Sequence, residues 1–549
     1  MKKGTEFTGE VLRLDYPNRG AVRTEEGEVT VKDVIPGTVI RGVVIKKRSG
    51  RPEGRALEEL APAPDALPVD CPSFGACGGC LMLSVPYGRQ LQIKNDQIRD
   101  LLMKAAGEDF PWEGIVPSPA QRHYRNKMEY TFGDEVMGGP LTLGLHRRGN
   151  YYDLCGASAC EIAEKDFGVI VAAVQAFFAD KSLPFFHRRT HVGVLRHLLL
   201  RKSRTTGEIL VSLVASTQEE DRLQALLPGF RDILLSLPLA GTIAGILHTK
   251  NDALADVVKD EGTEILYGKD YIEEELLGLR FTLTLFSFFQ TNTEGARSLY
   301  GKVREYVGSV DGADVMDLYS GTGTITQILA PAASRVTGVE IVPEAVDAAR
   351  LNAEKNGLAN CRFLCGDVLA KLDELAEEKP DIIVLDPPRD GVHPKALQKI
   401  LAYGAPRLIY IACKPSSLAR DLPVMQAAGY RVEKGCCVDM FPGTVHIETV
   451  VQLSKGNISS QNVKVEFSLE DMDMSRFQQG ATYEQIQERV QKKYGFHVSH
   501  LNIAKTKRKC GIIERQNYNL PKSEDSRSPE TPKEKEEAII EAFRHFQMA

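Results

Sequence analysis

The chain lacks a strong excess of charge, since 68 Lys and Arg residues oppose 74 Asp and Glu residues and the net charge is −6. No overall signature of nucleic-acid binding results, so local basic clusters would have to supply one. Long hydrophobic runs are also missing: the longest charge-free apolar segment, between Asp166 and Asp180, is too short to span a bilayer. No apolar stretch follows the first residues, which argues against a signal peptide. These absences predict a soluble, cytoplasmic protein without a membrane partner.

Disulfides are not expected in such a chain, because the cytosol keeps thiols reduced. The 11 cysteines are nevertheless unevenly distributed. Cys71, Cys77 and Cys80 lie close together in the sequence, and Cys155 and Cys160 follow them. Clustering of this kind indicates ligation of a metal or a metal cluster rather than scattered core thiols.

The length predicts several domains, because 549 residues exceed what one compact core accommodates. Residues 1–60 contain short strands separated by turn signals, which predict a small OB-like β-barrel, a fold that often binds RNA. Residues 69–290 mix a helix with strand-like stretches and predict a central α+β domain. Strands and helices alternate in residues 291–455, as in an α/β Rossmann-like sheet.

Residues 470–549 predict a helical C-terminal extension. Tyr483, Ile486 and Val490 share one face of a first helix, and Ser499 is a candidate cap for a second helix that carries several Lys and Arg residues. Two helices across a short turn resemble a helix-turn-helix. Residues 521–537 are polar and rich in proline, which predicts a mobile segment.

A cofactor site is predicted at the carboxyl ends of the strands in residues 291–455. One apolar strand leads through Tyr319 into a glycine turn at Gly321, and glycine lets the backbone approach a ligand closely. Acidic residues stand at or after the ends of three further strands: Glu340, Asp367 and Asp386.

These acids suit a nucleoside ligand. Glu340 is placed to accept ribose hydroxyls, and Asp367 is placed to reach an adenine amino group. The helix after the turn lacks the third glycine of a dinucleotide site, so S-adenosylmethionine is favoured over NAD. An ordinary tight turn without a ligand is the structural alternative.

A catalytic pair is predicted further along. Cys413 follows an apolar strand, where a loop exposes a nucleophile to substrate, and Glu448 opens another strand as a candidate general base. Methylation of uracil at C5 needs such a pair, because a thiolate must add to C6 and a base must then remove the C5 proton. A buried core cysteine and a surface glutamate are the alternatives.

Taken together, the residues resemble the uracil-C5 RNA methyltransferases of the RumA/TrmA type over residues 1 to about 455, closest to the 23S rRNA type. The Asp-Pro-Pro run at 386–388 and the segments 124–130 and 288–292 carry the resemblance, and the barrel resembles a TRAM domain at 34–37. The family usually has Asn after the nucleophile, where this chain has Lys414. By this resemblance Cys413 is the nucleophile, Glu448 is the base, and the residues that bind S-adenosylmethionine or substrate are Gln290, Tyr319, Gly321, Thr324, Glu340, Asp367 and Asp386.

The same resemblance assigns the early cysteines to a [4Fe-4S] cluster. The spacing of Cys71, Cys77 and Cys80 is that of the family, and Cys160 is the fourth ligand, with Cys155 as its competitor. Four thiolates would also suit zinc. The cluster would have a structural or RNA-binding role, because the methyl transfer needs no electron.

The predicted function is therefore S-adenosylmethionine-dependent methylation of uridine in RNA, with 23S rRNA favoured, tRNA as the alternative, and no obligate protein partner. A second possible function is that of an amino methyltransferase acting on adenine or glutamine. Those enzymes favour an aromatic residue after the prolines, where this chain has Arg389. A catalytically inactive RNA-binding or folding factor is a third. Phosphate contacts are expected from basic clusters at 46–55, 122–127, 147–148 and 188–204.

Overall fold

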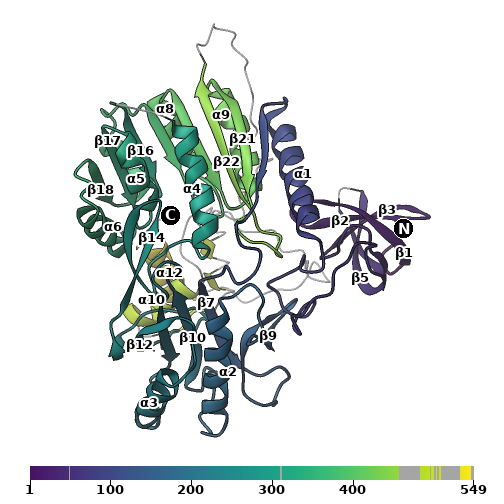
Figure 1. Cartoon of the computed structure of the whole chain (residues 1–549), viewed down its shortest axis with the longest axis vertical. Helices are drawn as coiled ribbons and strands as arrows, with labels where there is room; N and C mark the ends of the chain where they lie inside the picture. The colour runs from purple at the N-terminus through teal and green to yellow at the C-terminus, as the bar shows by residue number, and fades with distance from the viewer. Residues whose placement is uncertain are drawn as a thin grey trace. The chain divides into compact units, whose positions relative to one another are not determined.

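The computed structural model describes residues 1–48, 50–308, 312–456, 483–494, 496–499, 502–503, 506–507 and 532–545. The chain divides into two compact units, Met1–Gln461 and Asn462–Ala549. The first unit contains a closed barrel, a seven-stranded sheet, a two-stranded sheet and an eight-stranded sheet (Figure 1). No helix in the described part of the chain is long and apolar enough to cross a membrane.

The first strands close into a small barrel in the order β1-β2-β3-β5-β4, which confirms the barrel predicted at the N-terminus. Alternate side chains point inward, because successive residues of a strand face opposite sides, and Val11, Val22 and Val31 are fully buried. The long β4–β5 hairpin ends in exposed basic residues. The strands are β1 (Glu6–Asp15), β2 (Arg19–Thr24), β3 (Gly27–Lys32), β4 (Val39–Arg48) and β5 (Arg51–Ala61).

A seven-stranded sheet is built from residues 127–268, in the order β13-β12-β11-β10-β7-β8-β9. Helices α2 (Lys165–Ala179) and α3 (Glu220–Leu235) contribute buried residues to its core. A two-stranded sheet follows, with β14 (Tyr271–Leu276) and β15 (Leu279–Thr284). The strands of the larger sheet are β7 (Lys127–Gly133), β8 (Thr142–Arg147), β9 (Asn150–Gly156), β10 (Leu195–Lys202), β11 (Glu208–Ala215), β12 (Thr242–Lys250) and β13 (Thr263–Gly268).

The eight-stranded sheet has the order β18-β17-β16-β19-β20-β22-β21-β6. The first five strands are parallel and read as nearly continuous apolar runs, because helices cover such sheets. Its strands are β6 (Trp112–Val116), β16 (Asp314–Leu318), β17 (Arg335–Glu340), β18 (Cys361–Cys365), β19 (Ile382–Leu385), β20 (Arg407–Ala412), β21 (Tyr430–Val438) and β22 (Glu448–Lys455). Its helical elements are α4 (Thr293–Val307), α5 (Thr324–Leu329), η1 (Ala330–Ala332), α6 (Pro343–Lys355), α7 (Val368–Glu374), α8 (Pro394–Tyr403) and α9 (Pro415–Ala427).

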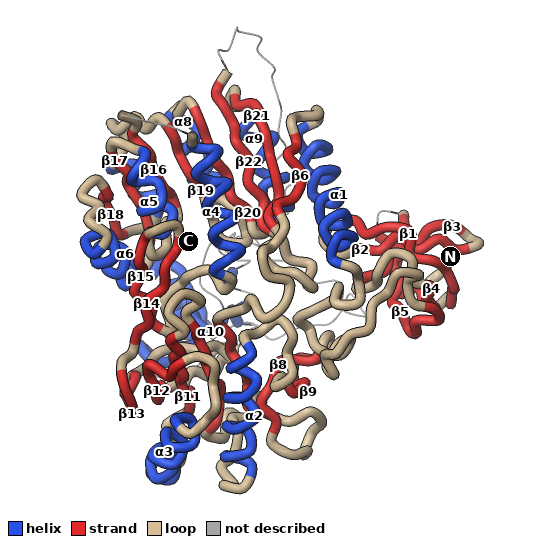
Figure 2. The backbone as a smooth tube through the Cα atoms, viewed as in Figure 1, coloured by secondary structure: helices blue, strands red, loops and turns tan. Residues whose placement is uncertain are grey.

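Two elements from early in the sequence complete this sheet. Strand β6 pairs in parallel with β21 at the edge, and helix α1 (Tyr87–Ala106) packs nearby (Figure 2). Ile98 and Leu102 of α1 are fully buried in the same hydrophobic core as residues of β20 and α9. Residues 87–116 therefore pack with the eight-stranded sheet, although they lie inside the range predicted for the central domain.

The second unit contains α10 (Tyr483–Tyr494) and α12 (Lys533–His545). Ile486 and Val490 of α10 pack with Ile539 and Phe543 of α12. Ser499 accepts a hydrogen bond from the backbone N of Asn502 at 3.2 Å, as a helix cap does. Most of the second predicted helix and most of the segment 521–537 lie outside the described residues.

Candidate active site

A cavity of about 1630 Å³ opens at the carboxyl ends of the parallel strands. We call it the main cavity. Strand β16 pairs with β17 on one side and β19 on the other, so the strand order reverses at β16, where ligands bind in such sheets. The structure brings every predicted catalytic and cofactor residue to this cavity: Gln290, Tyr319, Gly321, Thr324, Glu340, Asp367, Asp386, Cys413 and Glu448.

The turn after β16 has an unusual backbone. Tyr319 has φ 68°, in the left-handed region that non-glycine residues rarely adopt. Such strain persists where the surrounding structure enforces it, often at binding sites. Gly323 has φ 71°, and an added Cβ there would come within 2.5 Å of Phe363. The tight turn therefore requires glycine for space as well as for conformation.

Two of the predicted acids are held by backbone amides. Glu340 accepts hydrogen bonds from the amides of Gly321 at 3.0 Å, Ile341 at 2.8 Å and Val342 at 2.9 Å, which fix its carboxylate beside the turn. Asp367 caps α7, since its side chain accepts from the backbone N of Ala370 at 3.2 Å. Both carboxylates thus have a structural role in addition to facing the cavity.

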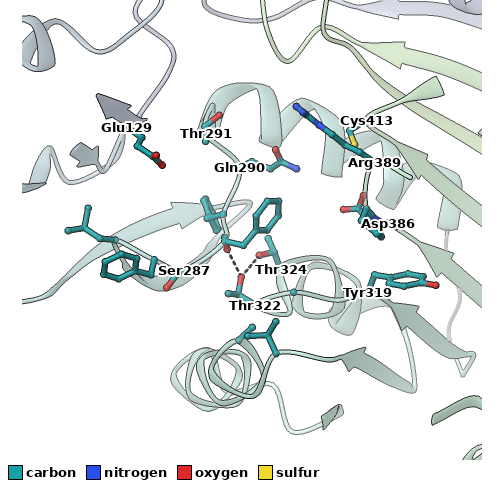
Figure 3. A pocket seen from close by; sticks show the side chains of 18 of the residues that line it. Glu129, Ser287, Gln290, Thr291, Tyr319, Thr322, Thr324, Asp386, Arg389 and Cys413 are labelled. Carbon is teal, nitrogen blue, oxygen red and sulfur yellow. Dashed lines mark hydrogen bonds between the residues drawn. The ribbon is translucent and has the colours of Figure 1, made fainter. Parts of the chain in front are cut away.

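Asp386, Arg389 and Cys413 lie together on one wall of the main cavity (Figure 3). Burial raises the pKa of the Cys413 thiol to about 11, and the carboxyl groups of Glu448 and Asp386 add to this rise. The nearby Arg389 guanidinium acts in the opposite direction. Burial also raises the pKa of Asp386 to about 7, because a charged carboxylate is poorly solvated there.

Glu448 begins β22, whose antiparallel direction places its first residue at the same edge as the ends of the parallel strands. The side chain is buried, and burial raises its pKa well above the usual range. Asp386 contributes to the rise and Arg389 opposes it. Three acidic groups, Cys413, Asp386 and Glu448, therefore share one poorly solvated space near the Arg389 guanidinium.

The loop between β21 and Glu448 is held by side chains from distant elements. Lys94 of α1 forms a buried ion pair with Asp439, with Nζ and Oδ1 2.7 Å apart. Further side chains bond its backbone: Lys94 donates to Phe441 O, Tyr124 donates to Pro442 O, Asn292 donates to Met440 O, and Gln90 accepts from Gly443 N. These bonds fix the path of the chain into Glu448.

Sequence reasoning missed three residues at this site. Arg389 and His446 line the main cavity, and Asp317 is fully buried beneath it. Burial raises the pKa of Asp317 to about 7, and its Oδ2 accepts a hydrogen bond from Thr326 at 2.6 Å. An acid inside an otherwise apolar strand was the available signal for Asp317. Arg389 was visible directly after the Asp-Pro-Pro run.

The predicted cluster ligands approach one another. Burial raises the pKa of each thiol, to about 12 for Cys80, and the thiols of Cys71, Cys77 and Cys160 contribute to the rise at Cys80. All the cysteines within the described ranges are free, including Cys155. However, no group of three or more His, Cys, Asp or Glu side chains among the described residues is arranged to hold a metal ion. The donor types suit a cluster, but the structure does not show the predicted site.

Two residues expected to contact phosphates are placed elsewhere. Arg196 and Arg201 are each only 2% exposed and donate to backbone carbonyls inside the protein. Assigning them to RNA was therefore wrong, because their charges are used to hold loops. Lys202 is likewise paired, with Glu164 and Asp166.

A different surface feature lies beside the main cavity. Tyr151 and Tyr152 are 54% and 51% exposed. The guanidinium of Arg188 lies 4.3 Å from the centre of the Tyr151 ring, and that of Arg189 lies 4.2 Å from the Tyr152 ring. His146, which lines the main cavity, stacks on Tyr151. We call these five residues the aromatic platform.

Comparisons with known proteins agree with this arrangement. The family model for tRNA (Uracil-5-)-methyltransferase matches residues 242–456. An uncharacterized RNA methyltransferase of Clostridium tetani is 43% identical over 455 residues, covering 83% of this chain and 99% of that protein. One from Chlorobaculum tepidum is 34% identical and covers 78% of this chain and 92% of its own length.

The crystal structure of the Pyrococcus abyssi tRNA (uracil-54, C5)-methyltransferase, in complex with S-adenosyl-L-homocysteine, superposes with a TM-score of 0.61. It is 23% identical and covers 81% of this chain and all of its own length, so the likeness is one of fold. Fold, cavity and relatives define an RNA methyltransferase. The chain belongs to the RumA/TrmA-type family of RNA (uracil-5-)-methyltransferases, as its sequence motifs predicted.

Proposed function

We propose that this protein transfers a methyl group from S-adenosylmethionine to C5 of a uridine in RNA through a covalent adduct. The observation that carries the proposal is the convergence of one thiol, Cys413, with the carboxyl groups of Glu448 and Asp386 in the main cavity. The cavity lies at the strand ends, where this fold binds its ligands. A catalytically inactive binding factor would have no need to gather these three groups.

The cofactor part of the cavity is formed by the turn after β16 and the following strand ends. Glu340 contacts the ribose hydroxyls, and Asp367 contacts the adenine amino group. Tyr319 and Gly321 line the part of the cavity between these two carboxylates. Gln290 and Thr324 complete this wall. When bound, S-adenosylmethionine supplies an electrophilic methyl group on a positively charged sulfonium, which favours the charged forms of the nearby acids.

The chain's own groups then perform two transfers. The Cys413 thiolate adds to C6 of the uracil, forming an S–C6 bond and moving electron density to C5. C5 then accepts the methyl group as the bond between that group and the cofactor's sulfur breaks, which would leave the cofactor as a neutral thioether. Glu448 removes the C5 proton, the C5–C6 double bond forms again, and the S–C6 bond breaks to return the thiolate. Asp386 orients the imide edge of the base.

The raised pKa of Glu448 suits this role, because a carboxylate with a raised pKa is a stronger base. The pKa of about 11 at Cys413 means that the thiol is protonated in the free protein at neutral pH. Arg389 is the cation that stabilises the thiolate when it forms. The reactive state therefore arises when the ligands bind.

The RNA reaches the cavity along two surfaces of the first unit. The TRAM-like barrel contributes exposed basic residues of the β4–β5 hairpin, which contact phosphates. The aromatic platform contributes exposed tyrosine rings on which unpaired bases stack. The target uridine must be unpaired or flipped out, because Cys413 cannot reach a base inside a helix.

Loss of Cys413 is the direct test of the mechanism. We expect Cys413→Ala to lower the rate of 5-methyluridine formation at least about 10³-fold, because no covalent activation of C5 remains. RNA containing 5-fluorouridine should form an adduct with the native protein that survives denaturing electrophoresis. Fluorine replaces the C5 proton, and because the base cannot remove fluorine, the S–C6 bond does not break. Cys365→Ala, at an exposed thiol outside the cavity, is the matched control. Full activity in Cys413→Ala would sink the proposed mechanism.

Large-subunit 23S rRNA is the proposed substrate. Mapping 5-methyluridine in a strain lacking this gene should show the loss of a site in 23S rRNA and none in tRNA. Loss of a tRNA site with intact rRNA would assign the other substrate.

We also propose that Cys71, Cys77, Cys80 and Cys160 bind a [4Fe-4S] cluster, which draws the four thiols together. Protein prepared without oxygen should contain about four iron and four sulfide ions per chain. Cys160→Ser should lose them, whereas Cys155→Ser should retain them. Zinc in place of iron in the purified protein would contradict this assignment.

A further inference from the structure

A second, smaller cavity of about 220 Å³ lies beside the loop that carries Cys413. We call it the side cavity. Cys413, Arg389 and His446 line both cavities, so the two spaces meet at the proposed nucleophile. The rest of its wall comes from Lys414 beside Cys413, from the β1–β2 turn of the barrel, from α1 and from the segment before β22, including Tyr16, Asn18, Gln97, Val445 and Ile447. The proposed methyl transfer makes no use of this space.

Two polar atoms in the side cavity lack a partner among the described residues. Asn18 Oδ1 and Gln97 Nε2 are both buried and take part in no hydrogen bond within that part of the chain. The identity of the Asn18 oxygen is fixed, because its Nδ2 donates to the carboxylate of Asp33 at 2.7 Å and a carboxylate accepts. Buried polar groups are rarely left unpaired in native proteins. One acceptor and one donor are therefore available to a ligand here.

The remaining walls suit a flat, partly apolar ligand. Val445 and Ile447 are apolar, and the Tyr16 ring is held in place by a hydrogen bond between its hydroxyl group and Ser416. Arg389 and Lys414 supply positive charge at the junction with the main cavity. A nucleotide matches this set, because the edge of its base carries a donor beside an acceptor and its phosphate is an anion.

We propose that the side cavity receives an unpaired nucleobase adjacent to the target uridine, and that Asn18 and Gln97 recognise its edge. This inference rests on the proposed function, since the same RNA strand delivers both bases. The base bound in the side cavity would hold the RNA strand in place while the target uridine occupies the main cavity. Binding at two points restricts the positions that the uridine can adopt. The barrel thereby contributes to the choice of substrate next to the nucleophile.

The test combines an altered RNA with altered protein. The RNA is the synthetic fragment in which the methylated uridine has been mapped, with single abasic nucleotides introduced at each position flanking it. The protein variant is Asn18→Gly with Gln97→Leu. Glycine is chosen because Asn18 has φ 62°, which strains other residues. Gln92→Leu is the matched control, an exposed position on the same helix.

In the native protein, one flanking abasic position should lower kcat/KM about tenfold or more, as expected for loss of one or two hydrogen bonds. In the double variant the intact RNA should already react that much more slowly, and the same abasic position should cause no further loss. Gln92→Leu should keep the native sensitivity. The inference would be overturned if the protein substitutions and the abasic nucleotide each lowered kcat/KM independently, so that their effects multiplied. It would also be overturned if the native protein methylated all the abasic RNAs at the same rate. Failure of the proposed function would look different, because no RNA would then acquire 5-methyluridine.

Discussion

The thiol of Cys413 sits between groups that oppose its ionisation and one group that favours it. Burial, Glu448 and Asp386 raise its pKa, and Arg389 lowers it. The balance gives a pKa of about 11, against about 8.5 for an ordinary thiol. The proposed nucleophile is therefore protonated in the free protein at neutral pH, which protects it from alkylation and oxidation.

Alkylation of Cys413 in the ligand-free protein should therefore depend on pH over an unusually wide range. Because only the thiolate reacts, the rate with iodoacetamide should rise about tenfold per pH unit from pH 7 to 10, whereas an ordinary thiol levels off near pH 8.5. Peptide mass spectrometry would measure the alkylation of Cys413 separately from that of the other cysteines. Arg389→Gln should slow the reaction at pH 8, because it removes the cation that lowers the pKa. Arg431→Gln, at an exposed site elsewhere, should not. A plateau near pH 8.5 in the native protein would refute the raised pKa.

At this level the sequence predicted which acids and which thiol lie at the strand ends, and all of them line the main cavity, although their roles stay predictions. It could not predict the charge state of Cys413. That state depends on Glu448 and Asp386, which only folding brings together. It was equally impossible to foresee that Asn18 Oδ1 and Gln97 Nε2 have no hydrogen-bond partner among the described residues, because the side cavity joins segments from the barrel, from α1 and from the loops around Cys413 and His446.

Among the helices and strands, α1 has the largest consequence for the site. It carries Lys94, whose side chain is 1% exposed and whose ammonium group pairs with the fully buried Asp439. A buried pair of this kind contributes little net stability, but removing one partner leaves an uncompensated charge. The pair therefore fixes the position of the loop before Glu448 more than it stabilises the protein as a whole.

Lys94→Met should loosen that loop, at a local cost of about 3–5 kcal/mol. Hydrogen exchange measured by mass spectrometry should show faster exchange in residues 439–447, and kcat should fall because Glu448 is no longer held in place. The double variant Lys94→Met with Asp439→Asn should recover much of the protection, since no buried charge remains. Lys104→Met, exposed on the same helix, should change neither quantity. Equal exchange in Lys94→Met and the native protein would show that the ion pair does not position the loop.

Local pattern identified α1 as a helix but could not assign it to a sheet. Strand β6 pairs with β21, more than 300 residues later in the chain, and no signal within either segment indicates the pairing. Periodicity reports which face of an element is buried, not which partner buries it. For this reason the sequence placed residues 87–116 in the central domain, next to their neighbours along the chain, although they pack with the eight-stranded sheet.

Across the whole first unit, the two surfaces proposed to bind RNA, the basic β4–β5 hairpin and the aromatic platform, should have separable effects on binding. Lys47→Ala, Arg48→Ala and Arg51→Ala together should weaken RNA binding and lower the slope of log affinity against log salt by about 0.7–0.9 for each phosphate group that the protein no longer neutralises. Tyr151→Ala and Tyr152→Ala should weaken binding by about 1–3 kcal/mol per stacked base with an unchanged slope. Tyr267→Ala, an exposed tyrosine on β13, is the control. Identical effects of the two sets on the slope would contradict the division.

The edge position of β6 has a consequence for how the chain is made. During synthesis β6 and α1 emerge long before β21, their eventual neighbour, and they must remain without it until most of the protein has left the ribosome. The barrel and the seven-stranded sheet have all their strands by then and are able to fold first. A fragment that starts at residue 291 would leave β21 as an unprotected edge, which invites aggregation. The eight-stranded sheet, which carries the main cavity, is thus completed by β6, a strand that is synthesised before the other seven.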